Sequence, residues 1–252
     1  MAKKKLARFA EMEKLENVFQ ARYEEIFRND HPLKGKWGKE VFRNDHPIVL
    51  EIGCGKGEYT VGLGKLYPEK NFIGIDIKGA RMWHGAKAAL EQNVSNAIFL
   101  RIYAEMLASV FAPGEISEIW ITFPDPQMTK ARKRLTGSRF LSLYARILKA
   151  GGLIHLKTDS PFLYAYTSEL IRINRLRCHV QTEDLYAAGM EDEILGIKTF
   201  YEQQWLSRGK QIKYIRFSLD GTDTFEEPDT EFEKDDYHSE ARYMNLNRAA
   251  NR

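Results

Sequence analysis

Three glycines at alternate positions, directly after a short apolar run, constrain this chain more than any other feature. The run Ile48–Ile52 is β-branched and apolar, as expected of a parallel strand buried on both faces. It leads into Gly53, Gly55 and Gly57, and glycine permits positive φ and lets the backbone approach a ligand closely. A helix and a second strand follow, with Asp76 near the end of that strand. The pattern predicts half of a mononucleotide-binding α/β unit, with the acid placed for ribose hydroxyls.

The rest of the chain alternates strands with helices. Further strands are expected over 97–102, 116–123, 153–157, 179–182 and 211–219, and helices over 79–92, 138–149, 161–174 and 199–206. Five strands alternating with helices, then two more, predict a Rossmann-like α/β fold. We expect a doubly wound, mostly parallel seven-stranded sheet with helices on both faces.

Composition divides the chain into three parts. Residues 1–46 form a basic N-terminal arm, with helical spacing over 11–27, that we expect to pack on the domain. Residues 47–219 hold the α/β domain. Residues 220–252 are acidic and poor in apolar side chains, so we expect a largely disordered tail.

Charge and composition limit the classes of function. The net charge of +3 combines −9 over 220–240 (ten acids and one lysine) with +12 elsewhere, and a body that basic suits a polyanionic partner. No apolar run reaches 18 residues and the lysine-rich start lacks an apolar segment, so we expect neither a membrane span nor a signal peptide. Cys54 and Cys178 are expected to be free thiols in a reducing cytoplasm.

The glycine motif has three interpretations. A dinucleotide fold has the fingerprint G-x-G-x-x-G, but here the third glycine comes one residue early. An S-adenosylmethionine (AdoMet) methyltransferase shows E-x-G-x-G-x-G with an acid closing the next strand, which Glu51 and Asp76 supply. AdoMet carries an ammonium and a sulfonium, so an acid beside the loop is electrostatically favourable. A glycine-rich turn without a ligand is the third interpretation, and we favour AdoMet.

The predicted strand ends gather the chemistry at one edge of the sheet, because ligands of open α/β sheets bind outside the carboxyl ends of the strands. Asp125 lies there between two prolines and is followed by a basic run from Lys130 to Arg134. Such an acid suits the Watson–Crick edge of a flipped base, while lysine and arginine hold phosphates. The alternative is a stiff turn followed by a solvated charge run. Glu105 has two interpretations, an acceptor from an adenine amine or the first-turn acid of a helix.

The chain resembles the tRNA (guanine-N7)-methyltransferases, which are AdoMet enzymes that methylate a variable-loop guanine, position 46 of tRNA. The resemblance runs from about Ile48 to Leu219. It rests on the ordered segments EIGCGKG, GIDI, FPDPQMTKARKRL, HLKTD and TFYE, the last two at 155–159 and 199–202. It implies the class I methyltransferase fold, AdoMet as cofactor and tRNA as partner, in a cytoplasmic monomer or homodimer.

The resemblance also implies a role for each matching residue. The cofactor would be bound by Glu51, Gly53, Gly55, Gly57, Asp76, Ala104 and Glu105. Asp125 would be the catalytic residue and would also contact the substrate nucleotide. Lys130, Asp159, Thr199, Tyr201 and Glu202 would contact the same nucleotide, with 199–202 closing the pocket.

The chain departs from the family at two places. Tyr103 stands where the family usually has an acid at the end of the third strand. The basic loop is about two residues shorter than usual, and Gln127 replaces a common tryptophan.

Guanine N7 carries no proton, so methyl transfer to it needs no general base, and neither a catalytic histidine nor a metal is expected. His155 is expected to be a core residue. The rival hypotheses are an AdoMet methyltransferase acting on another substrate, a non-catalytic RNA-binding subunit and, more distantly, a nicotinamide dehydrogenase.

Overall fold

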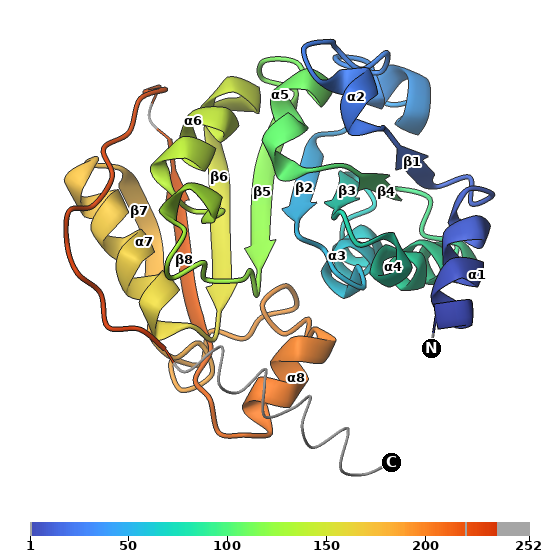
Figure 1. The fold of residues 1–252 in the computed structure, drawn as a ribbon. Helices are drawn as coiled ribbons and strands as arrows, with labels where there is room; N and C mark the ends of the chain where they lie inside the picture. Colours follow the sequence, from blue (N-terminus) through green and yellow to red (C-terminus); the bar gives the residue numbers. More distant parts are fainter. Residues whose placement is uncertain (1, 220, 236–252) are drawn as a thin grey trace.

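In the computed structural model, which describes residues 2–219 and 221–235, one mixed sheet of eight strands forms the centre of the molecule (Figure 1). The strands follow the order β1-β4-β3-β2-β5-β6-β8-β7. Those from β1 to β6 are parallel to their neighbours, whereas β8 is antiparallel to both β6 and β7. The bounds are β1 Val18–Gln20, β2 Ile48–Ile52, β3 Asn71–Ile75, β4 Ala97–Arg101, β5 Ile116–Thr122, β6 Leu148–Thr158, β7 Arg177–Thr182 and β8 Lys213–Ser218.

Helices cover both faces of this sheet. Their bounds are α1 Ala2–Met12, α2 Tyr23–Ile26, α3 Glu58–Leu66, α4 Gly79–Glu91, α5 Leu107–Val110, α6 Ser138–Ile147, α7 Pro161–Ile173 and α8 Phe200–Leu206. Three one-turn segments complete the list: η1 Trp37–Phe42, η2 Ala104–Met106 and η3 Ala131–Lys133. The predicted doubly wound α/β architecture is confirmed, with eight strands rather than seven.

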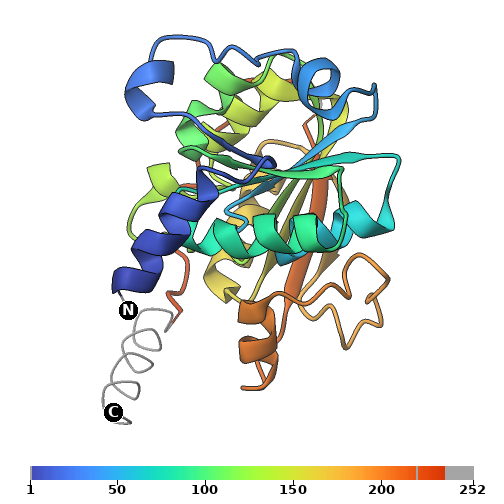
Figure 2. The same ribbon diagram turned by 90° about the vertical axis from the view of Figure 1, so that its right-hand side faces the viewer.

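Two buried clusters lie on opposite faces of the sheet. Alternate residues of β2 point to opposite faces, so Leu50 and Ile52 join the cluster under α5, α6 and α7, while Val49 joins the cluster under α3 and α4. Helix α1 packs against α4, which Figure 2 shows from the side, and Glu11 accepts a hydrogen bond from the Trp83 indole at 2.9 Å. Burial on both faces explains why the parallel strands have apolar sequences.

The extra strand comes from the N-terminal arm, where one helix was expected over 11–27. Strand β1 pairs in parallel with β4, with Val18 opposite Phe99. Val18 packs against the cluster of α3 and α4, whereas Phe19 packs against the cluster of α5, α6 and α7. Consecutive residues on opposite faces are the mark of a strand, so the expected helix was wrong for this segment.

The C-terminal segment is also more ordered than expected over 221–235. It has no regular secondary structure, but Phe225 is buried and Phe232 packs edge-on against Phe162 and Tyr166 of α7. Two aromatic side chains therefore anchor a stretch whose acidic composition predicted disorder. The remainder of the predicted disordered tail, 236–252, lies outside the described residues.

Candidate cofactor and substrate site

The glycine loop joins β2 to α3 and adopts a conformation that only glycine adopts without strain. The φ angles of Gly53, Gly55 and Gly57 are +78°, +56° and +73°. A Cβ on Gly57 would lie 2.4 Å from the ring of Phe99, whereas a Cβ on Gly53 would meet only Leu135, at 3.9 Å. Gly57 therefore allows α3 to pack on the sheet, and Gly53 keeps space open at the strand end.

Asp76 follows β3 and is bonded to this loop. Its Oδ2 accepts a hydrogen bond from the backbone N–H of Gly55 at 3.0 Å, and its Oδ1 accepts one from the N–H of Lys78 at 2.8 Å. The predicted acid and the predicted loop thus form one unit across two neighbouring strands.

A cavity of about 320 Å³ opens where the strands end. It is lined by Ile52, Gly53, Ile75, Asp76, Ile77, Ile102, Tyr103, Ala104, Glu105, Asp125, Gln127, Lys133, Leu135 and Phe140. Five of the predicted site residues are therefore brought together: Gly53, Asp76, Ala104, Glu105 and Asp125. The isoleucines offer an apolar surface for a purine, and Asp76 offers a carboxylate for ribose hydroxyls, so the cavity fits the adenosine part of AdoMet.

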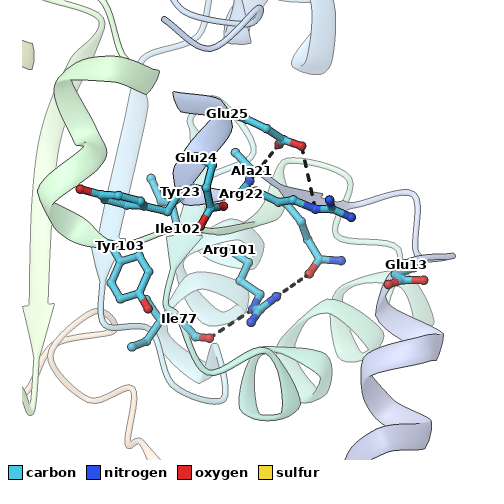
Figure 3. Close-up of a pocket in the computed structure, with 11 residues that line it drawn as sticks. Glu13, Ala21, Arg22, Tyr23, Glu24, Glu25, Ile77, Arg101, Ile102 and Tyr103 are labelled. Carbon is cyan, nitrogen blue, oxygen red and sulfur yellow. Dashed lines mark hydrogen bonds and ion pairs between the residues drawn. The ribbon is translucent and has the colours of Figure 1, made fainter. Parts of the chain in front are cut away.

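Tyr103 forms the outer rim of this cavity, at the position where an acid is usual. Its ring is 51% exposed and lies edge-on to Tyr23 of the N-terminal arm, with ring centroids 6.2 Å apart. Figure 3 shows this region, a wider cavity of about 710 Å³ that shares Ile77, Ile102 and Tyr103 with the first. Residues of the arm therefore line a second cavity that adjoins the first, which the sequence did not indicate.

The two interpretations of Glu105 are both compatible with its position. It lies in the first turn of η2 and also lines the smaller cavity.

Glu51 is placed differently from the other predicted cofactor residues, because its carboxylate is buried and does not line the cavity. It accepts hydrogen bonds from the backbone N–H of Thr60 at 2.9 Å and lies 2.7 Å from the Thr122 hydroxyl. Burial raises its pKa from 4.5 to about 7, against the lowering effect of these hydrogen bonds. In this structure Glu51 therefore links β2 to α3 and β5 by hydrogen bonds, and so stabilises the start of α3 that follows the glycine loop.

Asp125 sits in a turn with unusual backbone angles. Phe123 and Gln127 on either side have φ of +49° and +48°, a conformation that costs energy for residues other than glycine. The Oδ1 of Asp125 accepts a hydrogen bond from the N–H of Gln127 at 3.0 Å. Strained backbone of this kind clusters at functional sites, and here it turns the acid toward the cavity that Asp76 also lines.

The basic run after Asp125 contributes one lysine to the lining of the cavity. Lys133 lines the cavity, whereas Lys130 is exposed and does not. Lys133 belongs to the one-turn helix η3, which sets the direction of its side chain. Spacing along the sequence alone could not distinguish Lys133 from the other basic residues of this short loop.

The other predicted substrate residues are not among those that line the cavity. Asp159, which follows β6, is 4% exposed. Burial lowers the pKa of Lys213, and the charge of Asp159 acts against that lowering. Thr199 accepts a hydrogen bond from the N–H of Glu202 at 3.1 Å and so caps α8. Tyr201 is partly exposed and lies beneath the guanidinium of Arg81, at 5.6 Å.

Glu202 is fully buried against Lys157, with a carboxylate–ammonium distance of 2.8 Å. The same ammonium donates to the carbonyl of Leu195 at 2.6 Å, and the hydroxyl of Tyr186 donates to Glu202 at 2.7 Å. Glu202 is therefore engaged within the protein in this structure.

Helix α8 reaches the glycine loop through Phe200, which lies within the predicted segment 199–202 but was given no role of its own. The N–H of Phe200 donates to the Glu58 carboxylate at 3.3 Å, and the Lys56 ammonium lies 3.4 Å from the centre of the Phe200 ring. Phe200 is 38% exposed. The TFYE segment thus borders the loop, where it can cover a bound ligand.

His155 belongs to the core, as predicted. It is buried, stacks on Trp120 with ring centroids 3.9 Å apart and lies 2.7 Å from the Tyr214 hydroxyl. Burial lowers its pKa, which favours the neutral ring. Within the described residues, no group of three or more His, Cys, Asp or Glu side chains is arranged to hold a metal ion. In the same part of the chain, no helix has the length and apolar character needed to cross a membrane.

Residues 45–215 match the family model described as "Putative methyltransferase". A Porphyromonas gingivalis protein named "tRNA (guanine-N(7)-)-methyltransferase" is 60% identical over 232 residues, which is 90% of this chain and 95% of that protein. A Bacteroides thetaiotaomicron protein of the same name is 52% identical and covers 95% of each chain. A Geobacillus kaustophilus protein of that name is 36% identical over 77% of this chain and 82% of its own length.

Solved structures similar to this one share its fold at low sequence identity. One titled "Structure of an Antibiotic Related Methyltransferase" has a TM-score of 0.54 at 17% identity, over 72% of this chain and 92% of its own. The 16S rRNA methyltransferase KamB has a TM-score of 0.52 at 16% identity, over 77% and 95%. These similarities establish the class I methyltransferase fold.

Proposed function

The chain belongs to the tRNA (guanine-N7-)-methyltransferase family, and we propose that it transfers the methyl group of AdoMet to N7 of guanine 46, in the variable loop of tRNA. It is an AdoMet-dependent tRNA (guanine-N7-)-methyltransferase. The observation that carries the finer proposal is that Asp76 and Asp125, from two different strand ends, line the same cavity.

In the proposed site, Asp76 holds the ribose of AdoMet while Ile77 and Ile102 contact its adenine. Gly53 and Gly55 let the backbone come close to the methionine end. Ala104 and Glu105 close the adenine side of the cavity. Glu51 and Gly57 act indirectly, because they fix the loop and the start of α3. The bound cofactor supplies an electrophilic methyl group on a sulfonium.

Asp125 is the proposed catalytic residue. The N7 lone pair is free, so no side chain has to remove a proton before transfer. The protein instead aligns N7 with the methyl group, and alignment of reacting atoms lowers barriers by several kcal/mol. Asp125 accepts hydrogen bonds from the guanine edge, and its negative charge stabilises the positive charge that the purine gains.

The nucleotide itself is proposed to lie between the Asp125 turn, the end of β6 and α8. Lys130 and Lys133 form ion pairs with tRNA phosphates. Asp159 and Tyr201 lie beside the flipped nucleoside. Thr199 and Glu202 hold α8 in position over this space. The excess of positive charge outside 220–240 favours tRNA binding. We expect a cytoplasmic monomer or homodimer with an arm over 1–46, a catalytic domain over 47–219 and an acidic C-terminal segment over 220–252.

The proposal is tested by incubating the protein with labelled AdoMet and unmodified tRNA, and then cleaving the RNA selectively at N7-methylguanine. A single cut in the variable loop is expected. Label elsewhere in the RNA would overturn the assigned position, and bound AdoMet without any labelled RNA would point to another substrate. Affinity for tRNA should fall steeply with salt, since phosphate contacts release counterions.

The role of Asp125 is tested by Asp125→Ala, with Asp45→Ala as the control because Asp45 is exposed and does not line the cavity. We expect turnover by Asp125→Ala to fall by about 100-fold or more, given the usual effect of losing an electrostatic stabiliser. AdoMet binding should persist. Near wild-type turnover with normal tRNA binding would show that the assignment is wrong.

A further inference from the structure

We propose that the acidic C-terminal segment 221–235 is a brace for the catalytic loop, and that Glu227 is its positioning residue. The inference rests on the proposed function, because it concerns the loop that presents Asp125. The segment runs along the outside of α7 toward the carboxyl ends of the strands (Figure 1).

Contacts at both ends of α7 fix the path of the segment. Asn174, at the C-terminal end of α7, exchanges two hydrogen bonds with the backbone of Glu226, at 2.9 and 2.7 Å. Phe232 packs on Phe162 near the N-terminal end of the helix. At that end, Ser160, which directly follows Asp159 in the sequence, donates a hydrogen bond from its hydroxyl to Asp235. The segment therefore runs the length of α7, from the C-terminal end of this helix to its N-terminal end, which follows β6 at the edge of the sheet that carries the site.

Glu227 gathers several donors on one carboxylate. Its Oε1 accepts from the Tyr166 hydroxyl at 2.6 Å, and its Oε2 accepts from the Ser138 hydroxyl at 2.7 Å. The guanidinium of Arg134 lies 3.8 Å from Oε1. Only a carboxylate presents acceptors to all three groups, because a glutamine would turn an N–H₂ group toward one of them.

Arg134 carries the effect into the catalytic loop. It is 9% exposed and donates to the backbone carbonyls of Gln127 and Met128, at 3.2 and 2.9 Å. Gln127 in turn donates its N–H to Asp125. A continuous chain of contacts thus runs from Glu227 through Arg134 to the strained turn that holds the catalytic acid.

The alternative role for so acidic a segment is competition with RNA for the basic face. The two roles predict different residue dependence. Competition depends on total charge, so any of its acids would contribute about equally. Bracing depends on Glu227, which contacts Ser138, Tyr166 and Arg134. Glu231 is exposed and makes no hydrogen bond or ion pair within the described part of the chain. Glu231→Gln is therefore a control matched in charge and chemistry.

The test compares Glu227→Gln with Glu231→Gln in the full chain. We expect kcat of Glu227→Gln to fall about tenfold, because small misplacements of catalytic groups have effects of this size. KM for tRNA and Kd for AdoMet should match those of Glu231→Gln. The double variant Arg134→Lys with Glu227→Gln should be no slower than Arg134→Lys alone, since the two residues act through one path.

A second readout does not depend on activity. Trypsin cleaves after Lys130, Arg132 and Lys133, all in the braced loop, and loosening should raise the rate of cleavage there in Glu227→Gln but not in Glu231→Gln. Equal kcat and equal cleavage in both variants would overturn the brace, and equal tightening of tRNA binding in both would establish competition. A wild-type protein without methyl transfer would overturn the proposed function instead, while the cleavage assay would still decide whether the loop is braced.

Discussion

The backbone N–H of Gly55 donates a hydrogen bond to the carboxylate of Asp76 at 3.0 Å, so the glycine loop and the acid of the next strand hold each other. Because Gly53 of the loop and Asp76 line the same cavity, this carboxylate both orders the loop and forms part of the proposed cofactor site.

Asp76→Asn is expected to weaken AdoMet binding by about 10- to 100-fold. The asparagine oxygen replaces only one of the two carboxylate oxygens, so its N–H₂ group confronts either the Gly55 N–H or the Lys78 N–H. A donor left unpaired in this way costs about 1–3 kcal/mol and disturbs the loop that borders the cavity. Calorimetric titration with AdoMet measures the loss of affinity, and the thermal midpoint without ligand should fall as well. Unchanged affinity would remove Asp76 from the cofactor site.

Two glycines of the loop should separate folding from binding. Gly57→Ala places a Cβ 2.4 Å from Phe99 and 3.1 Å from the backbone of Gly85, so we expect it to lower the free energy of unfolding by at least about 2 kcal/mol. Gly53→Ala meets only Leu135, at 3.9 Å, and should lose about 1–2 kcal/mol from its positive φ.

The distinguishing measurement combines urea unfolding with AdoMet titration of each variant. Gly53→Ala should remain folded but bind AdoMet at least tenfold more weakly, because its methyl group enters the cavity. A Gly53→Ala protein with wild-type affinity would show that the cofactor does not approach this backbone.

Glu51 should make stability depend on pH. Its pKa is about 7 in the folded protein and 4.5 ordinarily, so the folded state binds the proton more tightly. The contribution of Glu51 to the free energy of unfolding is complete below about pH 4.5 and is lost as pH rises toward 7. The loss is about 3 kcal/mol at most, because each pKa unit corresponds to about 1.4 kcal/mol. Glu51→Gln removes the titrating group.

Urea unfolding at pH 5 and pH 7.5 checks this expectation. The stability of Glu51→Gln relative to the wild type should increase between the two values. Glu69→Gln, at an exposed carboxyl group, is the control and should follow the wild type. Identical pH dependence in wild type and Glu51→Gln would contradict the raised pKa.

The sequence predicted the parts of the site that strand ends bring together. Gly53, Asp76 and Asp125 follow three parallel strands, and parallel topology alone places such residues at one edge. The sequence did not predict that Glu51 is enclosed within the protein. Alternation along β2 decides only which face of the sheet Glu51 points to, and the hydroxyls that surround its carboxylate come from Thr60 of α3 and Thr122 of β5.

Other differences also arose from tertiary contacts. Val18 and Phe19 fit a helical pattern locally, yet pairing with β4 made them a strand. Phe225 and Phe232 are two aromatic residues in an acidic stretch, too few to suggest order until the surface of α7 provides their partners. Local composition carries no record of a complementary surface that lies far away in the sequence.

Glu202 forms a buried pair with Lys157, and its variants can show whether it contacts the substrate or supports α8. Both side chains are completely buried, with 2.8 Å between ammonium and carboxylate. Burial lowers the pKa of Lys157 despite the raising effect of Glu202. Removing one partner leaves an uncompensated charge, so Glu202→Ala should lower the free energy of unfolding by about 3–5 kcal/mol.

The double variant Lys157→Met with Glu202→Leu distinguishes the two roles. Apolar replacement of a whole buried pair is often neutral, so this variant should recover most of the stability lost in Glu202→Ala. If Glu202 only supports α8, methyl transfer should recover together with stability. If the carboxylate binds the nucleotide, the double variant should be stable and yet keep a raised KM for tRNA. Urea unfolding and steady-state kinetics on the same preparations therefore decide whether the TFYE segment acts through its fold or through this carboxylate.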